Sequence, residues 1–346
     1  MGNFDEYKRL TEPDKKEKLQ IWQTAIGLQD VDGLKPSDYL FETAKQNIDG
    51  IITISDVKER INSYYKTKSE RSGSDNRTEE ADKVSAHIAG ILAEKTFKLS
   101  PAEFISIHRR LFTGIYKFAG IIRDSNISKD EWVLNGDTVY YASADNIKET
   151  LDYDFTAEKK FDYKGLNIKQ KVEHIADFIS GIWQIHPFGE GNTRTAAVFL
   201  IKYLRFMGFT VSNDLFAEHS WYFRNALVRA NYNKLITGTY PTMEYLSRFL
   251  GNFILDEKNL LRNRDMRIKA GNNDDNKNKV QDKVQNKVQN DILKIISDRP
   301  NITQMELAQF INKSERTIKS IMKSMQERNL ITRNGSKKTG YWKILK

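Results

Sequence analysis

The residues with the clearest chemical potential stand in one short run, HPFGEGNTR, which spans His186 to Arg194. His186 has the pKa range of a general base. Glu190 supplies a hard oxygen ligand suited to a Mg²⁺ ion that bridges phosphates. Arg194 can make a forked, charge-assisted contact with phosphate oxygens. Together these residue types predict a site that handles a phosphate-bearing ligand.

Two apolar helices are predicted to hold this run. Residues 172–185 carry apolar side chains at helical spacing, and residues 196–207 are strongly apolar. The run is therefore a loop between two core helices. Asn192 to Arg194 open the second helix, where unpaired N–H groups and the helix dipole favour phosphate. Gly189 and Gly191 let the backbone turn tightly and approach a ligand.

The run resembles the signature of the Fic (filamentation induced by cAMP) family, HPFx[D/E]GN[G/K]R. Seven of its eight specified positions match, and Thr193 stands where Gly or Lys is usual. The resemblance covers roughly residues 81–253 and includes Tyr116 to Gly120 followed by Arg123. It implies an adenylyltransferase that moves AMP from ATP onto a Ser, Thr or Tyr hydroxyl of a target protein.

The resemblance also implies a role for each matching residue. His186 would deprotonate the target hydroxyl, and Glu190 would hold Mg²⁺ on the α- and β-phosphates. The backbone of the loop would form an anion hole, and Asn231 looks like the family's nucleotide-side Asn. The residues expected to bind the nucleotide or its phosphates are Gly189, Gly191, Asn192, Thr193, Arg194 and Asn231.

One segment, 132–143 (WVLNGDTVYYAS), interrupts the helical pattern. Two β-prone runs flank Asn135-Gly136, a pair that favours a tight hairpin turn because both residues tolerate positive φ. The resemblance implies that this hairpin is a flap that aligns the target by β-augmentation. The alternative is a purely structural hairpin. The expected target-binding residues are Gly136, Asp137, Thr138, Val139 and Tyr140.

Many Fic proteins are inhibited by a helix carrying [S/T]xxxE[G/N], whose Glu pairs with a second Arg three residues after the signature Arg. Here Ala197 occupies that second position, Asp49 replaces the Glu, and Lys45 stands at the Ser/Thr position. Three interpretations stay open: regulation lies elsewhere, Asp49 acts in a weaker clamp, or Asp49 only ends a helix. Without the second Arg, a donor other than ATP also stays open.

Composition and charge restrict the classes of protein. The chain of 346 residues lacks Cys, which excludes disulfide scaffolds, thiolate catalysis and Cys-ligated zinc and fits a reducing cytoplasm. No apolar stretch approaches the roughly 18 residues of a membrane span, and the charged N-terminus lacks a signal peptide's apolar core. The net charge of +9 is concentrated in 291–346, where 12 basic and 5 acidic residues leave +7.

That basic tail resembles a winged helix-turn-helix domain, a type that occurs fused to Fic domains in bacteria. A first helix is predicted to begin at 292–296 and to stop near Pro300, and further helices are predicted at 304–311 and 314–328, followed by strands at 330–332 and 341–345. The resemblance places the last helix in the DNA major groove. The alternative is a domain for protein–protein contact. The expected DNA-binding residues are Arg316, Lys319, Lys323, Lys337 and Lys338.

The sequence thus predicts a mainly α protein with a Fic-type helical bundle, a β-hairpin flap and a small winged-helix domain. The expected parts are an N-terminal regulatory region at 1–66, a Fic domain at 79–264, a polar linker at 265–290 and the winged helix at 291–346. The competing function is a DNA-binding regulator whose Fic domain binds nucleotide without catalysis. The target protein, the donor and the formation of a homo-oligomer stay open.

Overall fold

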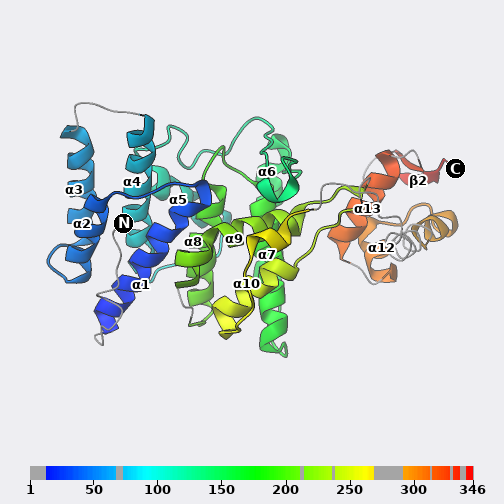
Figure 1. Cartoon of the computed structure of the whole chain (residues 1–346). Coiled ribbons are helices and arrows are strands. Elements are labelled where there is room, and N and C mark those ends of the chain that lie inside the picture. Colours follow the sequence, from blue (N-terminus) through cyan, green and yellow to red (C-terminus); the bar gives the residue numbers. More distant parts are fainter. Residues whose placement is uncertain are drawn as a thin grey trace. The chain divides into compact units, whose positions relative to one another are not determined.

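The chain forms two compact units, Met1–Ala270 and Gly271–Lys346, in the computed structural model (Figure 1). The structure describes residues 13–67, 73–210, 214–235, 238–268, 291–311, 314–327, 330–335 and 340–345. Most of the predicted linker, 269–290, lies outside these residues. The first four linker residues, 265–268, pack on the first unit, where Met266 is buried.

The first unit is built from helices joined by short loops. Local signals set several boundaries: the Ser100 hydroxyl accepts from the Glu103 backbone N–H, and Asn167 and Gln170 form a capping box. The 3₁₀ turns η2 (Leu28–Asp32), η3 (Trp132–Leu134), η4 (Ala144–Asn146) and η6 (Asn263–Met266) lie in the loops. The helices are α1 (Pro13–Gly27), α2 (Asp38–Ile48), α3 (Ile54–Thr67), α4 (Gly73–Ala93), α5 (Pro101–Phe112), α6 (Ile147–Lys160), α7 (Ile168–Ile185), α8 (Asn192–Phe206), α9 (Asp214–Asn231) and α10 (Glu244–Leu255).

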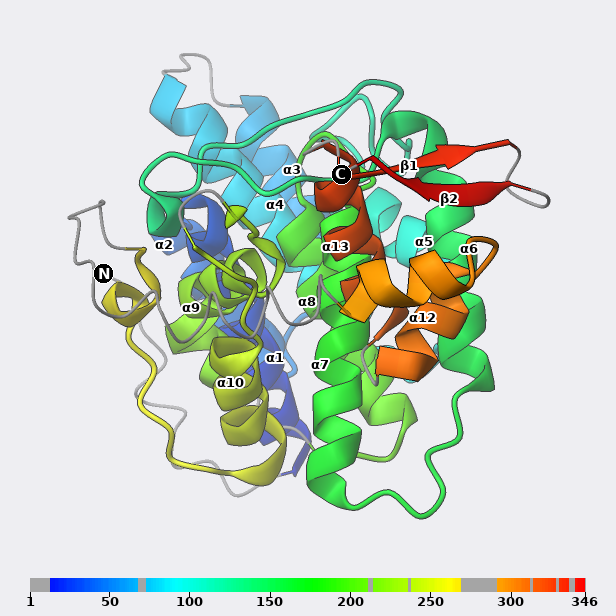
Figure 2. The ribbon, with the colours of Figure 1, turned by 90° about the vertical axis from the view of Figure 1, so that its right-hand side faces the viewer.

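One hydrophobic core connects these helices. The helix α7 packs against α6, α8, α9 and α10, and α8 is buried along nearly its whole length (Figure 2). The helix α1 packs against α4 and α9, so that the predicted N-terminal region shares this core. The loop between α7 and α8 is therefore held by two helices that have little freedom to move apart.

A buried acid ties three of these helices together. The Glu158 carboxylate of α6 accepts hydrogen bonds from the Tyr163 hydroxyl at 2.5 Å and from the Tyr203 hydroxyl of α8. It also lies 2.7 Å from His174 Nε2 on α7. Burial alone would raise the pKa of Glu158, but His174 and the two hydroxyls outweigh it and lower the pKa. The cluster fixes α7 and α8 relative to α6.

The prediction of a β-hairpin at 132–143 was wrong. Within the described range 73–210 no residue is in a strand; residues 132–134 form the 3₁₀ turn η3. The turn itself was predicted correctly, because Asn135 and Gly136 have φ of 55° and 89°. A hairpin ladder does not form: Val133 O accepts from the distant Ile268 N at 2.8 Å, and Glu131 O accepts from Gly136 N, within the turn, at 3.0 Å. The flap is therefore an irregular loop.

The second unit has the predicted winged-helix order. A helix at 291–298 precedes α12 (Gln304–Ile311) and α13 (Glu315–Glu327), and β1 (Ile331–Asn334) pairs antiparallel with β2 (Tyr341–Ile344). The Ser314 hydroxyl caps α13 by accepting from the Thr317 backbone N–H at 3.1 Å. The buried residues of this core are Ile292, Ile296, Ile302, Leu307, Ala308, Ile318, Met322, Met325, Ile331 and Trp342.

The described helices also bear on the membrane prediction. None of them combines the length and the apolar content that a membrane crossing requires.

Candidate active site

His186 stands at the junction between α7 and the loop. Its backbone is left-handed, with φ 50° and ψ 59°, a conformation that residues with a side chain rarely adopt. Arg123 secures this end of α7, because its Nε donates to the His186 carbonyl at 2.8 Å and its Nη2 to the Ala142 carbonyl at 2.5 Å. A non-glycine residue held in this conformation is typical of a functional position.

The imidazole of His186 is buried, with 3% of the residue exposed. Its Nδ1 lies 3.3 Å from the Trp183 carbonyl, and since a carbonyl only accepts, Nδ1 carries the proton and Nε2 is the acceptor. The ring packs on Tyr141 at a centroid distance of 4.1 Å. Burial, with help from Lys129, lowers the pKa of His186, so that the ring is neutral at neutral pH. It can therefore take up a proton.

The loop closes on itself through Asn192. Its side chain accepts from the Phe188 N–H at 3.0 Å and donates to the Phe188 carbonyl at 2.7 Å. Gly191 has φ 78°, and a Cβ there would lie 2.3 Å from the Phe112 ring, so this position requires glycine. Gly189 does not have a positive φ, and a Cβ there would make only an ordinary contact. Thr193, the departure from the Fic signature, turns its hydroxyl into the core, where it accepts from Trp183 Nε1 at 2.9 Å.

His108 on α5 contacts the same loop through a hydrogen bond and a ring stack. Gly120 N donates to its Nδ1 at 2.8 Å, which leaves Nε2 to donate to the Glu190 carbonyl at 3.0 Å. Its ring stacks on Phe188 at a centroid distance of 3.6 Å. Burial lowers the pKa of His108 to about 4, so that this hydrogen-bonding arrangement persists at neutral pH.

The guanidinium of Arg194 is enclosed by protein groups. Its side chain is 1% exposed; Nη2 donates to Glu80 Oε1 at 2.7 Å, and Nε lies 2.9 Å from Asp32 Oδ2. Gln29 and the Tyr116 hydroxyl each lie at 3.2 Å. Burial alone would lower the pKa of Arg194, but Asp32, Tyr116 and Glu80 outweigh it and raise the pKa. Arg194 is thus charged and paired with two carboxylates, although its buried Nε makes no hydrogen bond of good geometry.

Glu190 is the one predicted metal ligand. Its side chain is 54% exposed, and Oε2 lies 2.7 Å from Lys129 Nζ. The described residues contain no group of three or more His, Cys, Asp or Glu side chains that could hold a metal ion. A single carboxylate nevertheless fits Mg²⁺, which is commonly bound by one or two carboxylates together with phosphate oxygens and water. The donor set therefore suits a metal that arrives with a nucleotide.

Among the predicted flap residues, Asp137 and Val139 are held by contacts within the protein, whereas Tyr140 is exposed. Asp137 is anchored, because its Oδ2 accepts from Lys234 Nζ and from the Tyr232 hydroxyl, both at 2.7 Å, and these contacts lower the pKa of Asp137 to about 2. Val139 is buried in the core. Tyr140 is 76% exposed, while its carbonyl accepts from Gln184 Nε2. Within the expected set, Tyr140 thus offers the largest exposed side chain.

Two predicted residues lie apart from the loop contacts. Asn231 is buried at the end of α9, where its Nδ2 donates to Ser180 Oγ at 2.9 Å and to the Leu227 carbonyl at 2.9 Å. Asp49 follows α2 and lies 3.8 Å from Lys15 Nζ. The acids that the structure places on Arg194 are Asp32 and Glu80, neither of which the sequence identified. The roles of Asn231 and Asp49 remain predictions.

The predicted DNA-binding residues are partly described. Lys319 and Lys323 are exposed on α13, and Lys319 Nζ lies 2.8 Å from Glu315 Oε1. The side chain of Arg316, and all of Lys337 and Lys338, lie outside the described residues.

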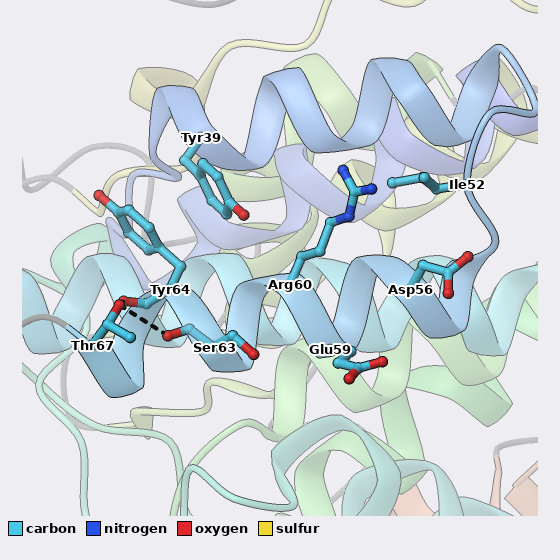
Figure 3. A pocket seen from close by; sticks show the side chains of 8 residues that line it. All are labelled: Tyr39, Ile52, Asp56, Glu59, Arg60, Ser63, Tyr64 and Thr67. Carbon is cyan, nitrogen blue, oxygen red and sulfur yellow. Dashed lines mark hydrogen bonds between the residues drawn. The ribbon is translucent and has the colours of Figure 1, made fainter.

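A separate cleft of about 490 Å³ lies between α2 and α3. Figure 3 shows Arg60 reaching from α3 toward α2, where its Nη1 donates to Gln46 at 2.8 Å. Tyr39 and Tyr64 stack at a centroid distance of 4.3 Å at one end. The cleft contains none of the predicted site residues; it is lined by Tyr39, Ile52, Asp56, Glu59, Arg60, Ser63, Tyr64 and Thr67.

Comparisons with known proteins confirm both resemblances. The Fic/DOC family model matches residues 98–204, and the model for winged helix-turn-helix DNA-binding domains matches residues 285–332. The chain therefore carries a Fic/DOC domain, which indicates a transferase of the Fic kind, and a winged helix-turn-helix domain. A comparison with curated proteins finds no match.

Two solved structures are similar to part of the chain. Both are N-terminal Fic domains of VirB-translocated Bartonella effector proteins. Bep8 from Bartonella sp. 1-1C is 18% identical, with 54% of this chain and 88% of that chain covered and a TM-score of 0.43. An effector from Bartonella sp. AR 15-3 is 17% identical, with 58% and 80% covered and a TM-score of 0.36.

We expect Gly191→Ala to lower the free energy of unfolding by about 1–3 kcal/mol, because the new Cβ meets the Phe112 ring on a left-handed backbone. Gly189→Ala is the matched control. A Cβ there would meet Phe118 at 3.6 Å, an ordinary contact, and we expect a change within about 0.5 kcal/mol. Urea unfolding measures both variants, and equal losses would contradict the prediction.

Proposed function

We propose that this chain, which carries a Fic/DOC domain and a winged helix-turn-helix domain, is a protein adenylyltransferase of the cytoplasm. It would transfer AMP from ATP to a Ser, Thr or Tyr hydroxyl of another protein. The observation that carries the proposal is the buried, neutral imidazole of His186, whose Nε2 is the acceptor nitrogen. His186 stands at the C-terminal end of α7, where the loop that carries Glu190 begins. That loop leads into the N-terminus of α8, which carries Arg194.

This arrangement supports the following course of the transfer. His186 Nε2 takes the proton of the target hydroxyl as that oxygen attacks the α-phosphorus. A bond forms between the hydroxyl oxygen and the α-phosphorus, the bond to the β-phosphate oxygen breaks, and pyrophosphate leaves. The first N–H groups of α8 lack helical acceptors and favour the phosphates. Mg²⁺, which Glu190 would hold, supplies charge neutralisation for the phosphates.

Replacing His186 tests the proposal most directly. We expect His186→Ala to reduce transfer of α-labelled AMP by at least about a hundredfold, because general-base catalysis contributes on that scale. ATP binding should be largely kept, as measured by calorimetry. His219→Ala, which alters a histidine of α9 instead, is the control and should retain transfer. Undiminished labelling by His186→Ala would remove His186 from this role.

Arg194 must change partners before it can bind phosphate. Its guanidinium is held by Asp32 and Glu80, so that phosphate oxygens have to compete with two carboxylates. This supports the interpretation in which regulation lies outside Asp49. The acids come from η2 and from α4, and both therefore link the N-terminal helices to the site.

We expect Glu80→Gln to tighten ATP binding about three- to tenfold, since one of the two competing charges is lost. Glu79→Gln is the matched control on the same helix, where Glu79 lies 2.6 Å from Lys83, and it should leave affinity unchanged. Calorimetry in excess Mg²⁺ measures both. Tighter binding by Asp49→Asn, with no effect of Glu80→Gln, would instead favour the weaker-clamp interpretation.

The winged-helix unit supports binding to DNA. The matching family is a DNA-binding one, and the region 291–346 has a net charge of +7. Lys319 and Lys323 on α13, with Arg316, Lys337 and Lys338, would contact the groove and the phosphates.

Removal of residues 271–346 should abolish DNA retention in a gel shift and leave AMP transfer in place. For the full chain, retention should weaken about a hundredfold or more between 50 and 200 mM salt, because phosphate contacts release counterions. DNA binding that survives the truncation, or that is insensitive to salt, would contradict this assignment.

A second candidate function is a DNA-binding regulator whose Fic domain binds nucleotide without catalysis. The winged-helix match favours it as much as it favours a DNA-bound enzyme. The labelling experiment separates the two, because a regulator would bind ATP and leave every protein, itself included, unlabelled.

A further inference from the structure

Among the residues that the structure describes, Lys129 is the cation that forms an ion pair with Glu190. Its Nζ lies 2.7 Å from Glu190 Oε2, and its side chain is 22% exposed. Lys129 comes from the segment between Arg123 and the flap turn, 61 residues before its partner in the chain. It is also the charged group with the largest effect on the pKa of His186. Lys129 therefore contacts the metal ligand of the proposed reaction, and its charge acts on the base.

The segment that carries Lys129 is anchored on both sides. The Lys129 backbone N–H donates to the Thr138 hydroxyl at 3.1 Å. Two residues later, the buried Glu131 forms an ion pair with Arg224 of α9. Arg123 holds the start of the segment by donating to the Ser125 carbonyl at 2.7 Å. These contacts position the ammonium at the Glu190 carboxylate.

The charges of the site are compensated in pairs. Arg194 is paired with Asp32 and Glu80, and Glu190 is paired with Lys129. A divalent cation that binds Glu190 competes with this ammonium, because two cations at one carboxylate repel each other. The displaced ammonium then lies beside a ligand that brings several negative charges, where a cation is stabilising.

We propose that Lys129 is a further residue of the site, which competes with the divalent cation for Glu190 and contacts the donor's phosphates once that cation is bound. The inference rests on the proposed function for the role of Glu190. The position of the second Arg in many Fic proteins is occupied here by Ala197 of α8, which is apolar and buried. In this proposal Lys129 supplies a positive charge from the segment that precedes the Asn135-Gly136 turn.

The test measures two affinities in the full-length protein with Lys129→Met. Without nucleotide, Mn²⁺ binding followed by electron paramagnetic resonance should tighten about three- to tenfold, because the competing charge is lost. With excess Mg²⁺, ATP binding measured by calorimetry should weaken by a similar factor. The opposite signs are diagnostic, since structural damage would weaken both.

The control is Lys83→Met, which removes a lysine that lies 2.6 Å from Glu79 and is 16% exposed on α4. It should change neither affinity. If Lys129→Met leaves Mn²⁺ affinity equal to wild type, including no measurable binding by either, the proposal is overturned. Tighter Mn²⁺ with unchanged ATP affinity overturns the phosphate contact. Glu190→Gln isolates the proposed function: if it leaves Mn²⁺ binding intact, the metal role of Glu190 fails instead.

Discussion

The buried guanidinium of Arg194 is the constraint on which the rest of the first unit depends. A charged group with 1% of its side chain exposed is tolerated only when nearby charges and hydrogen bonds replace water. Those groups come from distant parts of the chain: Asp32 and Gln29 from η2, Glu80 from α4 and the Tyr116 hydroxyl after α5. The N-terminal helices are therefore part of the site's electrostatics.

Because of this constraint, a ligand that binds Arg194 would have to replace Asp32 or Glu80 as its partner. Removing one partner from a buried ion pair typically costs about 3–5 kcal/mol, which is comparable to the affinity of a weak ligand. A phosphate that satisfies the guanidinium equally well recovers that cost. The Glu190–Lys129 pair is more exposed and is easier to open. A ligand that brings both a cation and several anionic oxygens, as in the proposed function, would replace the partners of both pairs.

Features that depend on neighbouring residues were predictable from the sequence. They are the signature loop, its flanking helices, the positive φ at Asn135-Gly136 and the winged-helix order. The flap structure was not predictable, since residues 132–134 are β-prone yet Val133 pairs with Ile268, 135 residues further along the chain. Asp32, Glu80 and Lys129 also escaped prediction. Nothing local distinguishes them from other surface charges, and only the packing of η2 and α4 against α8 brings the first two onto Arg194.

The left-handed backbone of His186 has a consequence for the evolution of the chain. A residue with a Cβ at φ 50° costs of order 1 kcal/mol or more relative to glycine, and asparagine tolerates the conformation better than most residues. Natural proteins accept such local losses where function requires them. A screen for thermal stability alone would therefore favour glycine or asparagine at this position, and would discard the imidazole that the proposed transfer uses as its base.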